Sequence, residues 1–217
     1  MRARSFALVA IVGVILAADA VAIRGAGAPG LSSVATPDPV VARRDADAFR
    51  VKLGEISRRG GETATVRPDA ARTTVTEPEV NGYLTLDVAD DLPAGVVSPN
   101  VVMLGQGRAS GQAVVDLDRV RQGLGANSVL NPLSYLRGRL PVVATGTLES
   151  HDGVARLLFE SATVSGVRVP KFVLQQIVSY YSKSETFPSG INLDDPFRLP
   201  ARIREIQVER GRAIVVQ

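Results

Sequence analysis

The chain of 217 residues contains no cysteine and only one histidine, His151. The absence of cysteine excludes disulfide bonds, thiolate metal sites, a cysteine nucleophile and a lipidated cysteine. It also suits an exported protein that needs no oxidative folding machinery. A Ser-His-Asp triad would have to be built around His151, which lies in a turn sequence. Because no catalytic or metal-binding motif is complete, the sequence predicts neither an enzyme nor a cofactor or metal site.

Lysine is also scarce: the 25 basic residues include only Lys52, Lys171 and Lys183. The formal net charge is +3, but acidic and basic residues alternate along the chain. This pattern does not form a basic patch for nucleic acid. With 45% hydrophobic and 22% charged residues, the chain can bury a sizeable core.

The N-terminus has the pattern of an export signal. Arg2 and Arg4 precede an apolar run over residues 6–18, and Ala18-Asp19-Ala20 follows as a small-x-small cleavage pattern. The run is shorter than the ~20 residues of a membrane span. We therefore predict a cleaved signal peptide over residues 1–20, with an uncleaved membrane anchor as the alternative. Either interpretation places the protein in the periplasm or at the outer face of the inner membrane.

Two regions follow the signal pattern. Residues 21–39 are rich in Gly, Pro and Ser, which predicts a flexible linker before a single domain over residues 40–217. Apolar residues then recur at helical spacing, which predicts a helix over residues 40–58 that ends at Arg59-Gly60-Gly61. A basic helix lying on anionic lipid is the alternative, but interspersed acidic residues favour packing against the domain itself.

The segment Thr76-Glu77-Pro78-Glu79 raises the question of an acid/base pair. Thr and Glu three residues apart form a capping-box pattern, and Pro suits the first turn of a helix. A cap explains both carboxylates, whereas a general acid would need a partner and an apolar pocket. A second acidic pair, Asp116 and Asp118, suggests metal binding by composition, but we expect Asp118 to cap a short helix.

Three hairpins are predicted from turn sequences between apolar segments. They pair residues 101–104 with 113–117, 142–150 with 154–164, and 203–209 with 212–216. The Gly-rich turn at residues 105–111 lacks the spacing of a dinucleotide fingerprint. Runs such as Leu157-Leu158-Phe159 place apolar side chains on both faces of the sheet. The predicted fold is α+β, a curved, mostly antiparallel sheet built from long hairpins and wrapped around a few helices.

A further helix is predicted after Pro170, with a broad apolar face. This helix can lie across the sheet and form one wall of an apolar groove. The candidate ligand-binding residues are Leu157, Phe159, Val173, Leu174, Ile177, Val178 and Tyr181. Packing in an ordinary core explains this apolar face equally well.

The order of these elements resembles that of YpmS-like and LmeA-like bacterial envelope proteins, which are similar to tubular lipid-binding (TULIP-type) domains. The matching pieces are Thr76 to Leu84, Ser165 to Tyr181 and Pro196 to Gln217, within residues 70–217. The resemblance implies a curved sheet wrapped around helices, with an apolar groove for acyl chains.

From these observations we expect a non-catalytic exported protein that binds lipid or another long apolar ligand between sheet and helices. The expected partners are an acyl-chain ligand and, if the N-terminal segment is uncleaved, the membrane; nucleic acid is not expected. An envelope scaffold that binds a protein partner is the alternative function, and an acid/base hydrolase is the least favoured.

Overall fold

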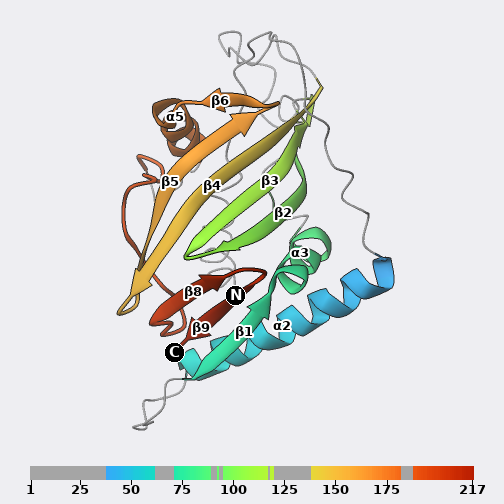
Figure 1. Cartoon of the computed structure of the whole chain (residues 1–217), viewed down its shortest axis with the longest axis vertical. Helices are drawn as coiled ribbons and strands as arrows, with labels where there is room; N and C mark the ends of the chain where they lie inside the picture. Colours follow the sequence, from blue (N-terminus) through green and yellow to red (C-terminus); the bar gives the residue numbers. More distant parts are fainter. Residues whose placement is uncertain are drawn as a thin grey trace.

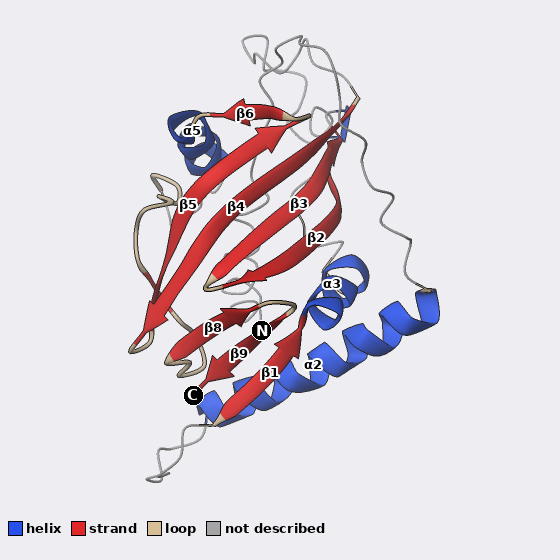
Figure 2. Ribbon diagram, viewed as in Figure 1, coloured by secondary structure: helices blue, strands red, loops and turns tan. Residues whose placement is uncertain are grey.

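The computed structural model describes residues 38–61, 71–88, 92, 95–116, 118–119, 138–181 and 188–217. These residues form an α+β fold of helices and two antiparallel sheets, with long strands that slant across the molecule (Figures 1 and 2). The predicted fold class is confirmed. Residues 1–37 lie outside the described residues. They include the whole predicted signal peptide and almost all of the predicted linker.

The larger sheet has six strands and contains two of the predicted hairpins. Its order is β2 (Val96–Gly105), β3 (Arg108–Asp116), β4 (Arg139–His151), β5 (Val154–Val164) and β6 (Val167–Val169), and β7 (Phe197–Arg198) also pairs with β5. The turn between β4 and β5 is Asp152-Gly153, as predicted. The turn between β2 and β3 is only Gln106-Gly107: residues 108–111, predicted as part of the turn, belong to β3 and pair with residues 101–105. The segment around β7 contributes a short strand to this sheet.

The two faces of this sheet differ in character. Cross-strand pairing aligns Val101, Gly111, Ala144 and Ala162 on one face, and all four are buried. We call this the inner face. The opposite, outer face carries the row Val102, Ser110, Thr145 and Ser161. The small side chains of the inner row allow other parts of the chain to approach the backbone closely.

A β-bulge in β5 decides which residues point inward. Glu160 is the extra residue that the register with β4 skips. One extra residue reverses the alternation of side chains along a strand. Leu157 and Phe159 therefore lie on the same face as Ala162, whereas Leu158 is on the outer face and is 38% exposed.

The smaller sheet has the order β1 (Arg72–Thr76), β9 (Arg212–Val216) and β8 (Glu205–Glu209), with the third predicted hairpin at its centre. Backbone hydrogen bonds join it to the β2–β3 hairpin. The N–H of Gly107 donates to the carbonyl of Val208 at 3.0 Å, and the N–H of Gly211 donates to that of Met103 at 3.0 Å. The two sheets therefore meet at the end of the larger sheet that holds this hairpin.

Helices α2 (Pro39–Gly61) and α3 (Glu77–Leu86) cross beside the smaller sheet, and α5 (Lys171–Tyr181) lies against the other end of the larger one (Figure 1). The predicted helix at residues 40–58 is confirmed and is longer. The crossing is close because Gly82 has no side chain: a Cβ there would lie 2.7 Å from the carbonyl oxygen of Ala42. Phe49 and Tyr83 pack edge to face, with ring centroids 5.0 Å apart. No described helix is long and apolar enough to span a membrane.

The buried hydrophobic residues of the described chain form three clusters. The α5 cluster contains Val115, Val142, Ala144, Ala162, Val164, Leu174, Val178 and Leu193. The α3 cluster contains Leu84, Val88, Val101, Met103, Val208 and Ala213. The α2 cluster contains Ile56, Ala155, Leu199, Ile203 and Val215. Leu148 and Ile206 pack against both the α3 and α2 clusters, so these two form one continuous body.

Candidate functional site

The carboxylate of Glu79 is engaged in structural contacts. Its Oε2 accepts the backbone N–H of Thr76 at 2.8 Å, which is the return bond of the predicted capping box. The ammonium of Lys52 lies 2.7 Å from each carboxylate oxygen. Burial raises the pKa of Glu79, but the hydrogen bonds from Lys52 and Thr76 outweigh it, and the pKa lies below its ordinary value. This carboxylate is therefore unsuited to donate a proton near neutral pH.

Glu77 and Asn81 close the free edge of β2. Glu77 Oε2 accepts the backbone N–H of Met103 at 2.7 Å. Asn81 Oδ1 accepts the N–H of Val101 at 2.7 Å, and its Nδ2 donates to the Val101 carbonyl at 2.9 Å. Because β2 is an edge strand, the N–H groups of Val101 and Met103 and the Val101 carbonyl would otherwise lack partners on that side. Side chains of α3 thus take the place of a neighbouring strand, and both carboxylates of the motif have structural roles.

The second acidic pair is also structural. Asp116 Oδ1 accepts the backbone N–H of Asp118 at 3.1 Å and of Arg119 at 3.2 Å. Asp116 precedes this turn and accepts two of its N–H groups. The residues that follow Arg119 lie outside the described residues, so a capping role of Asp118 stays a prediction. The bond from the Arg119 N–H, with a contribution from Arg139, holds the pKa of Asp116 below its ordinary value despite desolvation. His151 is exposed at a hairpin tip.

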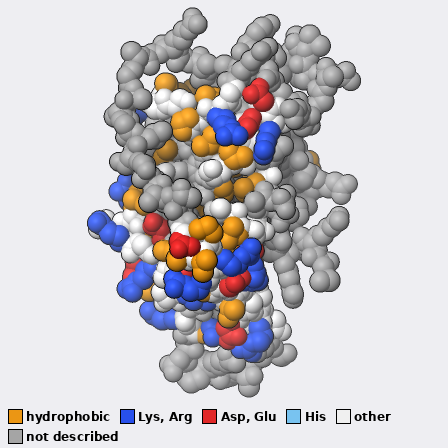
Figure 3. Space-filling model, turned by 90° about the vertical axis from the view of Figure 1, so that its right-hand side faces the viewer, with side chains coloured by type: hydrophobic (Ala, Val, Ile, Leu, Met, Phe, Trp, Pro, Cys, Tyr) orange, Lys and Arg blue, Asp and Glu red, His pale blue; other side chains and the backbone are white. Residues whose placement is uncertain are grey.

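The described residues contain no group of three or more His, Asp or Glu side chains that could hold a metal ion. On the face shown in Figure 3, basic and acidic side chains are intermixed with hydrophobic ones, as the alternating charges of the sequence suggested.

The predicted groove residues on α5 have different surroundings. Leu174 and Val178 are 2% and 1% exposed and belong to the α5 cluster, which packs on the sheet. Val173 is half-buried. The side chains of Ile177 and Tyr181 lie outside the described residues. A role of this helix in ligand binding stays a prediction.

The two predicted groove residues on β5 lie on the inner face. Phe159 is half-buried and packs against the α5 cluster. Leu157 is half-buried and belongs to none of the three clusters. Along β5 it lies between Ala155 of the α2 cluster and Phe159. Leu157 therefore lies between the two ends of the described core and belongs to neither.

Neighbouring strands place very small residues beside Leu157 on the same face. Gly146 lies on β4 between Ala144 of the α5 cluster and Leu148. Ala109 pairs with Gly146, and Gly111 follows on the same face of β3. We call Ala109, Gly111, Gly146 and Leu157 the inner-face band. Alternating Ala and Gly at residues 109, 111 and 113 is a sequence signal that could have identified it.

Comparisons with known proteins give little further information. No protein-family model and no curated protein matches the chain. Among solved structures, it is similar to a crystal structure of lipopolysaccharide binding protein, with 15% sequence identity and a TM-score of 0.21. That match covers 72% of this chain and 46% of the other, so the chain spans less than half of that protein. The resemblance to envelope proteins with a tubular lipid-binding domain stays a prediction.

Proposed function

We propose that this protein binds a lipid, or another long apolar molecule, without catalysing a reaction. The observation that carries the proposal is the inner-face band, where small side chains and half-buried Leu157 separate the α5 cluster from the other two clusters. Gly111 and Gly146 carry no side chain, and Leu157 lies over Gly146, where a Cβ would be 3.2 Å from its Cδ1. A chain bound on this band would lie where the Leu157 side chain now is. Each buried methylene contributes about 0.8 kcal/mol, so such binding needs no polar site.

Two further observations support this proposal. The carboxylates of the Thr76–Glu79 motif are engaged by Lys52, Thr76 and Met103, which favours binding over acid/base catalysis. The basic flank, apolar run and small-x-small pattern at the N-terminus support export to the periplasm or to the outer face of the inner membrane. A protein in this compartment would meet membrane lipids directly.

The test compares two adjacent leucines on opposite faces of β5. Leu157→Trp should fill the inner-face band, whereas Leu158→Trp adds the same volume on the outer face. Each variant and the wild type are purified, and their organic extracts are compared by mass spectrometry alongside thermal unfolding. The wild type and Leu158→Trp should carry lipid, and Leu157→Trp should lose it while retaining its melting temperature.

A wild type that carries no lipid, or two variants that retain it equally, would overturn the proposal. An envelope scaffold with a protein partner would then be the better interpretation. Val178→Trp gives the contrasting case of a filled core. Because Val178 is 1% exposed, this substitution should destabilise the fold by about 1–3 kcal/mol.

A further inference from the structure

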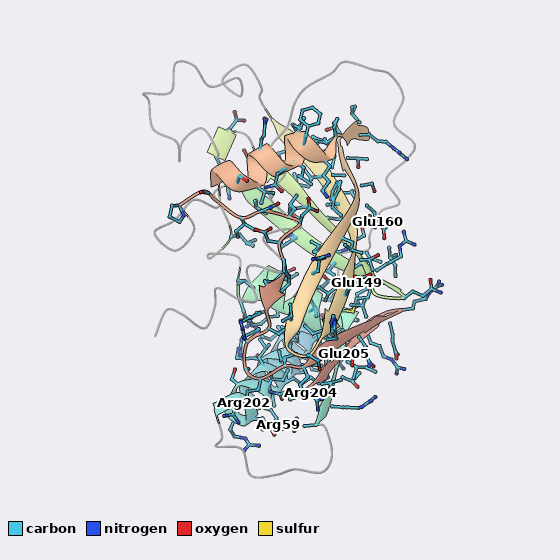
Figure 4. The ribbon with its side chains drawn as sticks, turned by 90° about the vertical axis from the view of Figure 1, so that its left-hand side faces the viewer. Arg59, Glu149, Glu160, Arg202, Arg204 and Glu205 are labelled. Atoms are coloured by element: carbon cyan, nitrogen blue, oxygen red, sulfur yellow. The ribbon has the colours of Figure 1, made fainter. Side chains whose placement is uncertain are left out.

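A cavity lies at the tip of the β4–β5 hairpin, away from α5. Its volume is about 380 Å³, within the ~300–1,000 Å³ of small-molecule sites. It is lined by Asp152, Gly153, Arg198, Leu199, Arg202, Ile203 and Arg204. We call it the arginine pocket. Figure 4 shows Arg202 and Arg204 at the same end of the molecule as Arg59.

The lining of the arginine pocket is strongly unbalanced in charge. Three arginines and one acidic residue, Asp152, are among the residues that line it. Arg198 and Arg204 form no ion pair or side-chain hydrogen bond with any residue that the structure describes. Like charges that share a cavity repel one another, and a bound anion would offset that repulsion.

The floor of the pocket is apolar. Leu199 and Ile203 line it, and both are buried in the α2 cluster. The arginines beside them, Arg198, Arg202 and Arg204, are exposed. The pocket therefore combines exposed positive charge with an apolar part of its lining.

Backbone hydrogen bonds hold the two sides of the pocket together. The N–H of Gly153 donates to the carbonyl of Arg204 at 2.9 Å, and the carbonyl of Gly153 accepts the N–H of Leu199 at 2.8 Å. The hairpin tip is thus bonded to both ends of the segment that supplies the arginines. A site held in this way loses little further freedom when a ligand binds.

The turn that presents Arg202 is held in a strained conformation. Ala201 and Arg202 have φ values of 53° and 55°, which cost about 1–3 kcal/mol each for residues with a Cβ. The side-chain amide of Gln217 donates to the carbonyl of Ala201 at 2.7 Å. Gly60 leaves room for the turn, because a Cβ there would lie 2.5 Å from the Ala201 backbone. Contacts from α2 and the segment after β9 therefore stabilise this placement of Arg202.

We propose that the arginine pocket binds a phosphate group, carried either by a lipid headgroup or by a small soluble molecule. The planar guanidinium group donates two parallel hydrogen bonds to phosphate oxygens, and such charge-assisted bonds are strong. The proposal is independent of acyl-chain binding at the inner-face band, because the two sites share no residue.

The test uses the full chain and two probes. Inorganic phosphate is titrated by calorimetry, and flotation compares phosphatidylcholine vesicles with and without phosphatidylglycerol. The variants are Arg198→Gln and Arg204→Gln. Arg168→Gln is the matched control, because Arg168 is an exposed arginine on β6, outside the pocket, with no ion pair among the described residues.

The wild type should bind at least one probe, and each pocket substitution should weaken binding about tenfold or more, whereas Arg168→Gln should not. Binding of inorganic phosphate indicates a soluble ligand, and flotation that requires phosphatidylglycerol indicates a headgroup. An equal loss in Arg168→Gln would overturn the proposal, since it indicates general attraction between charges. If the pocket variants fold poorly, the wild type alone is tested by two measurements. One is flotation with vesicles that contain phosphatidylglycerol, and the other is the melting temperature in phosphate compared with chloride of equal ionic strength. The proposal fails if flotation does not depend on phosphatidylglycerol and phosphate does not raise the melting temperature.

Discussion

Replacing Asn81 with alanine should open the free edge of β2. The Asn81 amide makes two hydrogen bonds to the backbone of Val101, which is 9% exposed. Each backbone group that loses its partner in a buried position costs about 1–3 kcal/mol. Alanine has a higher helix propensity than asparagine, by less than about 0.7 kcal/mol. The expected net loss in the free energy of unfolding is therefore about 2–5 kcal/mol.

The measurement is urea-induced unfolding of the wild type, Asn81→Ala and the control Thr85→Ala. The Thr85 hydroxyl donates to the Asn81 carbonyl on the exposed side of α3, so its removal should change stability by less than about 0.5 kcal/mol. Amide hydrogen exchange of the peptide over residues 100–105 should also become faster in Asn81→Ala alone. Equal stability of the two variants, with unchanged exchange, would refute the role assigned to Asn81.

Two further predictions concern α2 and its neighbours. The pKa of Glu79 in the folded protein is below its ordinary value of 4.5. The stabilisation from its pairing with Lys52 is therefore complete above pH 4.5, and it is lost as the pH falls through the lowered pKa. Urea unfolding repeated from about pH 6 to about pH 3 should therefore show a steeper loss for the wild type than for Glu79→Gln; parallel curves would contradict this. Thermal unfolding should show that Gly60→Ala destabilises, because its Cβ would lie 2.5 Å from the Ala201 backbone. A Cβ at Gly54 would meet no other atoms within 4 Å, so Gly54→Ala should raise the free energy of unfolding by about 1 kcal/mol. If Gly60→Ala were stabilised as well, the contact assigned to residue 60 would be contradicted.

The features that the sequence predicted correctly depend on residues close together in the chain. Thr76 and Glu79 are three positions apart and form the expected return bond of a capping box. Asp152-Gly153 and Arg210-Gly211 form the expected hairpin turns, since the conformation of a turn depends on its own residues. Three hairpins with apolar strands were enough to indicate an antiparallel α+β fold.

The features that the sequence did not predict depend on contacts between distant segments. Nothing near Asn81 indicates that its amide binds Val101, and nothing near Glu160 indicates that β5 bulges there. The sequence predicted a helix over residues 40–58, but α2 continues to Gly61. Gly60 remains helical where α2 packs against the turn at Ala201. The arginine pocket joins a hairpin tip to a segment more than forty residues later, and only the folded chain brings them together.

The strand order of the smaller sheet also has a consequence for the order of folding. β9 lies between β1 and β8, so β1 has no neighbour in that sheet until residues 212–216 have been made. The β4–β5 hairpin, by contrast, closes through a two-residue turn and can form as soon as its own residues leave the ribosome. Pairing between segments far apart in sequence is slow, because a long loop must close first. During synthesis, β1 therefore remains an unpaired strand, open to pairing with other chains, until the final hairpin reaches it.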